Sequence, residues 1–473
     1  MNAGAVRNYF RPRQRDLEHL QMHQHTIDQL LAERFRCPGF NAELTSAPNL
    51  SAGYGYFRFG ADAICYGQCS SEVPAAVVRD KLHVASEKVC INGSAVQFPF
   101  DPVQIVDNLR LERYASNSTR DNDTVLTKRA VRNLYYLLRP FMPVAIRKQF
   151  QKQYFRGWEK LPFPSWPVDG TVEKIFERLL VCAMRAGKVD RLPFIWFWPD
   201  GALSCAILTH DVETSAGLGF CPQLMDLNDS FEIKASFQIV PEERYQVRPS
   251  FLKNIRDRGF EVNVHDLNHD GRLFTERAEF LRRAERICSY AREFGALGFR
   301  SAVLYRNADW FDALDFSYDM SVPNVAHLDP QRGGCCTVFP FFIGNLVELP
   351  VTTTQDYSLF HVLGDYSIRL WQKQIALIRK RHGLMNFIIH PDYIRPERAR
   401  RVYGELLRYL AELRSRGEVW IALPKEVAAW WRMRNEMSLV REGNSWRVEG
   451  KGSDRAKLAY AVLVDDRIVY EID

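Results

Sequence analysis

The sequence lacks a long hydrophobic run. Its N-terminus, "MNAGAVRNYFRPRQRDLEHL", contains no apolar core of the length that a secretory signal needs. No later stretch reaches the roughly 18 consecutive apolar residues of a membrane-spanning helix. We therefore expect a cytoplasmic protein, and association with a membrane surface stays open.

The sequence also lacks a cysteine pattern and a strong charge bias. Its ten cysteines are scattered, two are adjacent (Cys335 and Cys336), and no pair of C-x-x-C units occurs, which favours reduced thiols over a disulfide framework. The net charge of +6 is too small an excess to indicate nucleic-acid binding. There is no internal repeat and no low-complexity segment.

Apolar material is abundant. With 46% hydrophobic and 12% aromatic residues, a chain of 473 residues can bury a large core, and its length favours two to four domains. Residues 1–50 are predicted to form a helical segment and a loop, and residues 51–190 an accessory α+β domain. Residues 191–436 are predicted to form the catalytic domain, and residues 437–473 a C-terminal β extension of two hairpins.

A basic, aromatic segment lies at 128–160, where nine Lys or Arg residues face one acidic residue. Such a segment could contact an anionic membrane surface or a glycan-assembly partner. The alternative is an amphipathic helical pair packed on its own neighbour with its lysines in water.

From about residue 200, short apolar runs alternate with helical patterns. Repeated β-then-α units build a parallel sheet or barrel, in which active residues gather at the carboxyl ends of the strands. The expected helices cover 276–294, 366–380 and 396–416. The expected strands are 203–209, 233–240, 260–264, 296–300, 316–320, 345–351, 384–390 and 418–423.

Candidate site residues follow four of these strands. His210, Asp211 and Glu213 end the first, and Arg300 and His390 each end a later one. His265 and His269 follow the strand at 260–264, and a helical turn there would let both imidazoles reach one ion. A carboxylate with two histidines leaves a coordination position open for water, as in catalytic zinc sites. His19 and His23 have the same spacing in a polar segment, where a metal site is not expected.

This order of a strand-end acid, H-x-x-x-H, a strand-end Arg and "IIHP" resembles the polysaccharide deacetylase family, also called carbohydrate esterase family 4 or the nodulation-type deacetylase domain. The resemblance covers about residues 200–430. "KASFQIVP" (234–241), "GFEVNVHDLNHDG" (259–271), "FSYDMS" (316–321) and "VELPVT" (347–352) are similar to family segments. The resemblance implies an α/β fold of the deformed (β/α) barrel type. In this chain we expect the barrel to be joined to a mixed α+β N-terminal region and a small β C-terminal tail.

The chain departs from the family pattern at several positions. The family's first motif has two adjacent aspartates, a base and a metal ligand, whereas strict alignment here puts Val212 at the ligand position. On a D-x-D pattern, Asp211 would be the base and Glu213 the ligand, and the two would share a face of the strand. Asp211 could instead bind the metal itself. Asp266 replaces the usual Ser or Thr, and the proline expected after Arg300 is missing.

The resemblance implies a metal-dependent hydrolase that removes N-acetyl or O-acetyl groups from a sugar or polysaccharide precursor. The cofactor would be a divalent metal, with zinc the expected ion, and the partner an N-acetylated sugar or oligosaccharide. Alternatives are a deformylase or other C–N hydrolase acting on a sugar intermediate, and an inactive glycan-binding protein. The implied roles are base for Asp211, acid for His390, positioning of the base for Arg300, and metal binding for Glu213, His265 and His269.

Overall fold

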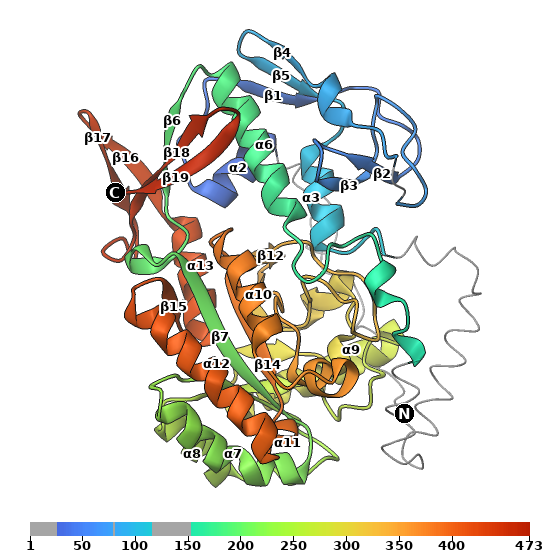
Figure 1. The fold of residues 1–473 in the computed structure, drawn as a ribbon, viewed down its shortest axis with the longest axis vertical. Helices are drawn as coiled ribbons and strands as arrows, with labels where there is room; N and C mark the ends of the chain where they lie inside the picture. The colour runs from blue at the N-terminus through green and yellow to red at the C-terminus, as the bar shows by residue number, and fades with distance from the viewer. Residues whose placement is uncertain (1–25, 79–80, 116–152) are drawn as a thin grey trace, which may run out of the picture.

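A computed structural model describes residues 26–78, 81–115 and 153–473 of the chain (Figure 1). A sheet surrounded by helices fills the lower part of the view, and the N-terminal elements and the C-terminal hairpins lie above it. The basic segment predicted at 128–160 falls outside the described residues up to 152, so its membrane or glycan contact stays a prediction. None of the described helices is both long and apolar enough to cross a membrane.

One nine-stranded sheet forms the centre of the protein. Its strand order is β12-β13-β11-β10-β9-β8-β7-β14, with β15 paired to the start of β7, and every neighbouring pair is parallel except β12 and β13. The eight strands expected from the sequence are all present. They are β7 (Ser204–Val212), β8 (Ser236–Ile239), β9 (Glu261–His265), β10 (Gly298–Arg300), β11 (Tyr318–Asp319), β13 (Leu346–Glu348), β14 (Leu384–Ile389) and β15 (Val419–Ile421). The added strand is β12 (Phe341–Ile343).

Burial explains why these segments are strands and why their sequences are continuous apolar runs. All nine residues of β7 and all six of β14 are buried, as expected where helices cover one face of a parallel sheet and side chains fill the other. The helix α9 (Arg277–Phe294) buries Phe280, Ala284, Ile287 and Ala291, the spacing of one helical face. The other covering helices are α7 (Ser215–Asp229), α8 (Pro249–Asp257), α10 (Arg369–Arg379), α12 (Glu397–Ser415) and α13 (Pro424–Glu436).

The two ends of the sheet are joined by hydrogen bonds from side chains to backbone carbonyls, not by a backbone ladder between two strands. After β13 the chain runs beside β14, where the Thr352 hydroxyl donates to Leu384 O at 2.7 Å and the Thr353 hydroxyl donates to Asn386 O at 2.8 Å. The Asn386 side chain donates in turn to Leu349 O at 3.0 Å. These bonds join the two ends of the sheet, which confirms the predicted deformed (β/α) barrel.

The N-terminal elements form a separate layer above the barrel. A parallel pair, β1 (Glu43–Ser46) and β5 (Ala95–Phe98), is extended by β4 (Cys90–Asn92), and β2 (Gly55–Arg58) pairs with β3 (Ile64–Gly67). Three helices pack on these strands, namely α2 (Ile27–Phe35), α3 (Pro102–Arg110) and α6 (Thr171–Ala186). The mixed α+β character of this region agrees with the sequence pattern, whereas the predicted domain boundaries stay predictions.

The C-terminal residues form the two expected hairpins, β16–β17 (Ser438–Glu442 and Ser445–Glu449) and β18–β19 (Leu458–Val464 and Arg467–Ile472). The strand β18 also pairs with β6 (Arg191–Ile195), so the end of the chain joins the segment that leads into the barrel. Buried Arg434 of α13 fastens this junction by donating to Ile195 O at 2.6 Å and to Arg34 O at 3.1 Å.

Candidate metal centre

Three potential metal ligands meet at the carboxyl end of the barrel. Glu213 follows β7, His265 ends β9, and His269 lies in the loop after β9. Glu213 Oε1 lies 2.9 Å from His269 Nε2 and 3.8 Å from His265 Nε2. One ligand atom from each residue lies within 4.8 Å of the other two. The structure therefore brings together the three residues that the sequence proposed as metal ligands.

The backbone that presents the two histidines differs from the expected helical turn. Residues 266–269 form a bent loop, in which Asp266 and His269 both have φ of 57°, a left-handed conformation that non-glycine residues rarely adopt. The Asp266 carboxylate stabilises this loop by accepting the backbone N–H of Leu267 at 2.6 Å and that of Ala302 at 3.3 Å. The histidine rings lie 4.9 Å apart as a result.

The histidine nitrogens fit a divalent cation. The Nδ1 atom of His265 lies 3.1 Å from Arg300 O, a contact that places the proton on Nδ1 and leaves the Nε2 lone pair free. The Nε2 atoms of His265 and His269 are buried and have no hydrogen-bond partner among the described residues. Glu213 Oε1 and His269 Nε2 lie 2.9 Å apart without forming a hydrogen bond. Two ligand atoms that bind the same ion would also lie close together without a hydrogen bond between them. Two imidazole nitrogens and a carboxylate oxygen suit a zinc-type ion.

His269 has an unusual neighbour on its other nitrogen. Its Nδ1 lies 3.2 Å from Arg244 Nη2, which also donates to His269 O at 2.6 Å. A cation bound at His269 Nε2 would leave the ring proton on Nδ1. The Nδ1–H group would then face Arg244 Nη2, which is also a donor, so the two could not form a hydrogen bond. Arg244 would then keep only its bonds to the carbonyl oxygens of His269 and Asn268.

Asp211 lies beside this cluster and is held by Arg300. The fully buried Arg300 donates through Nη1 to Asp211 Oδ1 at 2.7 Å and to Thr209 Oγ1 at 2.6 Å. The other oxygen, Asp211 Oδ2, lies 3.7 Å from His265 Nε2. Burial alone would raise the pKa of Asp211, but the charge of Arg300 outweighs it and the pKa lies below its ordinary value. Asp211 is therefore ionised and has one oxygen facing the cluster.

His390 also contacts the cluster, through Glu213, and its partner, Asp356, is absent from the sequence prediction. His390 Nε2 lies 3.4 Å from Glu213 Oε1, while His390 Nδ1 lies 2.6 Å from Asp356 Oδ1. Burial lowers the pKa of His390, but the charges of Asp356 and Glu213 outweigh it and hold this pKa well above 6.5. Asp356 lies well past Glu348, the end of β13, so a search for polar residues at strand ends does not find it.

His210, which the sequence groups with Asp211 and Glu213, lies on the opposite face of β7. Successive side chains of a strand alternate, so His210 and Val212 point to the helices while Asp211 and Glu213 point inward. Both ring nitrogens of His210 are engaged, by Ile389 O at 3.3 Å and by the Asn228 side chain at 3.0 Å. Burial lowers the pKa of His210 to about 3, so the ring is neutral. His210 packs the barrel against α7 and does not belong to the metal cluster.

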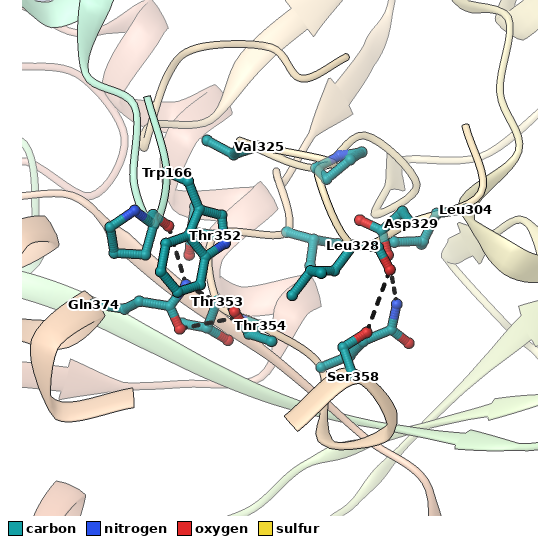
Figure 2. A pocket seen from close by; sticks show the side chains of 14 residues that line it. Trp166, Leu304, Val325, Leu328, Asp329, Thr352, Thr353, Thr354, Ser358 and Gln374 are labelled. Carbon is teal, nitrogen blue, oxygen red and sulfur yellow. Dashed lines mark hydrogen bonds between the residues drawn. The ribbon is translucent and has the colours of Figure 1, made fainter. Parts of the chain in front are cut away.

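A small cavity lies among the segments that follow β10, β11 and β13, with Leu304, Asp329 and Gln355 in its wall (Figure 2). Its volume is about 20 Å³, room for about one water molecule. Leu304 and Val351 line it, and together with Ile388 they form an apolar cluster separate from the main core. Trp166 of the segment before α6 and Asp329 also line it. The rest of the wall includes polar side chains, among them those of Thr352, Thr353, Thr354, Ser358 and Gln374.

No family model and no curated protein matches the chain. Solved structures do, and three illustrate the range. A Mycobacterium smegmatis protein, whose assignment as a polysaccharide deacetylase is itself inferred, is 20% identical, with a TM-score of 0.41 over 53% of this chain and 98% of its own. PuuE allantoinase is 15% identical, with a TM-score of 0.39 over 50% of this chain and 92% of its own. The peptidoglycan deacetylase PdaC from Bacillus subtilis is 12% identical, with a TM-score of 0.33 over 49% of this chain and 95% of its own. Over about half its length, the chain is similar to solved polysaccharide deacetylases.

Proposed function

We propose that this protein is a metal-dependent hydrolase that removes N-acetyl, or O-acetyl, groups from a sugar or polysaccharide precursor. One observation carries the proposal: beside the cluster of Glu213, His265 and His269, the Asp211 carboxylate lies 3.7 Å from His265 and the His390 imidazole lies 3.4 Å from Glu213. Hydrolysis of an amide needs a group that takes a proton from water and another that gives one to the leaving nitrogen.

Glu213, His265 and His269 would hold the cation, and Asp211 would be the base. When bound, a divalent ion would supply Lewis acidity to the attacking water and to the acyl carbonyl. Asp211 Oδ2, the oxygen that Arg300 does not hold, would accept a proton from that water. Because Asp211 Oδ1 is already committed to Arg300, the arrangement favours Asp211 as base over Asp211 as metal ligand.

His390 would act as the general acid. Its Nε2 faces the cluster, and Asp356 holds its Nδ1 and favours the charged imidazolium. The water oxygen bonds to the acyl carbon, the C–N bond breaks, and His390 protonates the nitrogen as it leaves. Without that proton the leaving group would be an amide anion, which is a very poor one. Acetate and a free amino sugar are the products.

The apolar cluster of Leu304, Val351 and Ile388 suits the acyl methyl group. Ile388 lies two residues before His390 in an extended segment, so their side chains share a face. Leu304 lies in the loop that follows Arg300. A methyl group is the size of substituent that such a cluster accepts, whereas the cavity of about 20 Å³ excludes a sugar ring. We assign the sugar to the open side of the centre, where the side chain of Glu213 is 19% exposed.

The test is an acetate-release screen over N-acetylated oligosaccharides and sugar intermediates with zinc, cobalt and nickel supplied in turn. We expect acetate release that needs the metal and that Asp211→Asn lowers by roughly 10²–10⁴-fold. Formate release from N-formyl sugars instead of acetate would select the deformylase alternative. A protein that binds metal and glycans yet hydrolyses none of them would be the inactive glycan-binding protein.

A further inference from the structure

The N-terminal layer meets the active end of the barrel at a buried ion pair. Arg306, in the loop after β10, pairs bidentately with Glu112, which lies just after α3, and Arg306 Nε lies 2.6 Å from Glu112 Oε2. The Arg306 side chain is 1% exposed and that of Glu112 is 10% exposed. A buried pair of this kind is costly to break from one side, because the remaining charge is left unpaired.

The surroundings of Glu112 are shaped for this contact. Glu112 has φ of 55°, and its Oε1 also accepts the backbone N–H of Gly334. Gly333 has φ of 128°, and a Cβ at that position would lie 2.6 Å from Glu112 Oε1. Tyr114 adds a hydroxyl bond of 2.6 Å to Gly334 O. The backbone on both sides is therefore held so that the Glu112 carboxylate reaches the barrel.

The loop that Arg306 anchors is strained. Val303 and Leu304 have φ of 59° and 53°, consecutive left-handed conformations that are unfavourable for large L-residues, above all a β-branched one. Arg306 Nη1 donates to Leu304 O at 2.8 Å and so holds the backbone of Leu304 in this conformation. The Gln331 side chain exchanges two hydrogen bonds with the backbone of Arg306. Such a conformation persists only where its surroundings impose it.

Two paths lead from this anchor to the candidate centre. In the first, the loop begins at Arg300, and its Ala302 N–H bonds to the Asp266 carboxylate between the two metal-ligand candidates. In the second, burial raises the pKa of Asp329 to about 6 and the charge of Arg306 opposes that rise, and the Asp329 carboxylate accepts a hydrogen bond of 2.7 Å from Gln355. Gln355 immediately precedes Asp356, the partner of His390. Leu304 and Asp329 both line the cavity of Figure 2.

We propose that Glu112, outside the barrel, is a positioning residue that holds the 301–306 loop in its strained conformation and thereby sets the acyl pocket at Leu304. The kinetic consequences of this inference rest on the proposed function. The anchoring of the 301–306 loop by Glu112 does not depend on it. It makes the N-terminal layer a part of the active end of the enzyme. The barrel alone would lack the charge that keeps Arg306, and with it Leu304, in place.

The test compares the full-length metal-loaded protein with its Glu112→Gln variant. Glutamine keeps the size of the side chain and an acceptor for Gly334 N–H but loses the charge. Glu418→Gln is the matched control, because Glu418 pairs with Arg379 at the other end of the barrel. We expect hydrogen–deuterium exchange of the 301–306 amides to rise at least tenfold in Glu112→Gln and to stay unchanged in Glu418→Gln.

The kinetic readout separates positioning from general destabilisation. Relative to the native chain, Glu112→Gln should lower kcat/KM for acetate release about tenfold or more and should reduce the preference for acetyl over propionyl donors. Its metal content should not change. Glu112→Asp, which restores the charge, should recover part of both. The inference is overturned if the Glu112→Gln variant folds and its 301–306 amides exchange at the same rate as in the native chain, whatever its activity.

The exchange arm also covers the other outcomes. If Glu112→Gln does not fold, the same measurements apply to Arg306→Lys, which keeps the charge but loses the bidentate contact. A native chain that releases no acetate refutes the proposed function and leaves the exchange result to decide the anchoring. A native chain that is active, with a Glu112→Gln variant of equal activity and acyl preference, refutes the positioning role.

Discussion

Asp356 and His390 form a two-point contact at the active end of the barrel. The Asp356 carboxylate lies 2.6 Å from His390 Nδ1 through Oδ1, and through Oδ2 it accepts the His390 backbone N–H at 2.8 Å. This double contact fixes both the position of the ring and the nitrogen that carries its proton. The free nitrogen, Nε2, is thereby the one that faces Glu213.

The first prediction concerns the pH dependence that follows from this contact. A pKa of His390 held above its ordinary value keeps the general acid protonated to higher pH, so activity falls only as the pH rises through that pKa. Asp356→Asn removes the negative charge and should move the alkaline limb of the kcat/KM profile to lower pH. The measurement is kcat/KM for acetate release across the alkaline range. An unmoved alkaline limb would remove His390 from the acid role.

The second prediction concerns the metal. The native chain should hold about one divalent ion, measured by elemental analysis after dialysis, because three ligands of the preferred types converge there. The double variant His265→Ala/His269→Ala should hold none. The control is His19→Ala/His23→Ala, which removes two histidines of the same spacing and should leave the metal content unchanged. A native protein that gains no ion on incubation would contradict the metal centre.

The third prediction distinguishes the roles of two acids, Asp211 in β7 and Glu213 just after it. Asp211→Asn should lower kcat by roughly 10²–10⁴-fold, the usual contribution of a general base, and should retain the metal. Glu213→Gln should weaken metal binding, because Glu213 Oε1 contacts the Nε2 atoms of both histidines, at 2.9 Å from His269 and 3.8 Å from His265. Titration with zinc and steady-state kinetics on both variants give the two readouts. The reverse pattern would exchange their roles.

The fourth prediction uses His210. Its pKa is about 3 in the folded chain and about 6.5 when unfolded, so the unfolded state binds the proton first as the pH falls. This group therefore reduces stability below pH 6.5, by roughly 1.4 kcal/mol per pH unit down to about pH 3. His210→Gln should be less stable at pH 7.5 but should lose less on going to pH 5.5. Urea unfolding at the two pH values tests this, and equal losses in both proteins would refute it.

The parallel β/α arrangement could be predicted because its strands are buried along their whole length, whereas the barrel followed from the resemblance to the deacetylase family. A parallel strand covered on both faces needs an apolar residue at nearly every position, as in β7 and β14, and the covering helices need a periodic apolar stripe, as in α9. Polar residues at the ends of such runs are then conspicuous. Asp211, His265, Arg300 and His390 are residues of this kind, and the structure brings them together.

Residues outside such runs could not be predicted in the same way. Asp356 lies in a helical turn after β13, with no apolar run directly before it, and only the closure of the sheet brings it to His390. The left-handed loop of Asp266 and His269 carries no pattern that distinguishes it from a helical turn. Glu112 reaches Arg306 across 194 positions of sequence, a separation that no local pattern reports.

The sequence by itself determined the strands, the covering helices and the residue types at the strand ends, because burial and hydrogen bonding impose their periods locally along the chain. The tertiary structure decided which of those side chains share a point in space. Assembly of the sheet brought Glu213 beside His269 and His390, and closure of the sheet brought Asp356 to His390. Packing of the N-terminal layer added Glu112. These are relations between distant segments, and their energies depend on separations that exist only after the chain has folded.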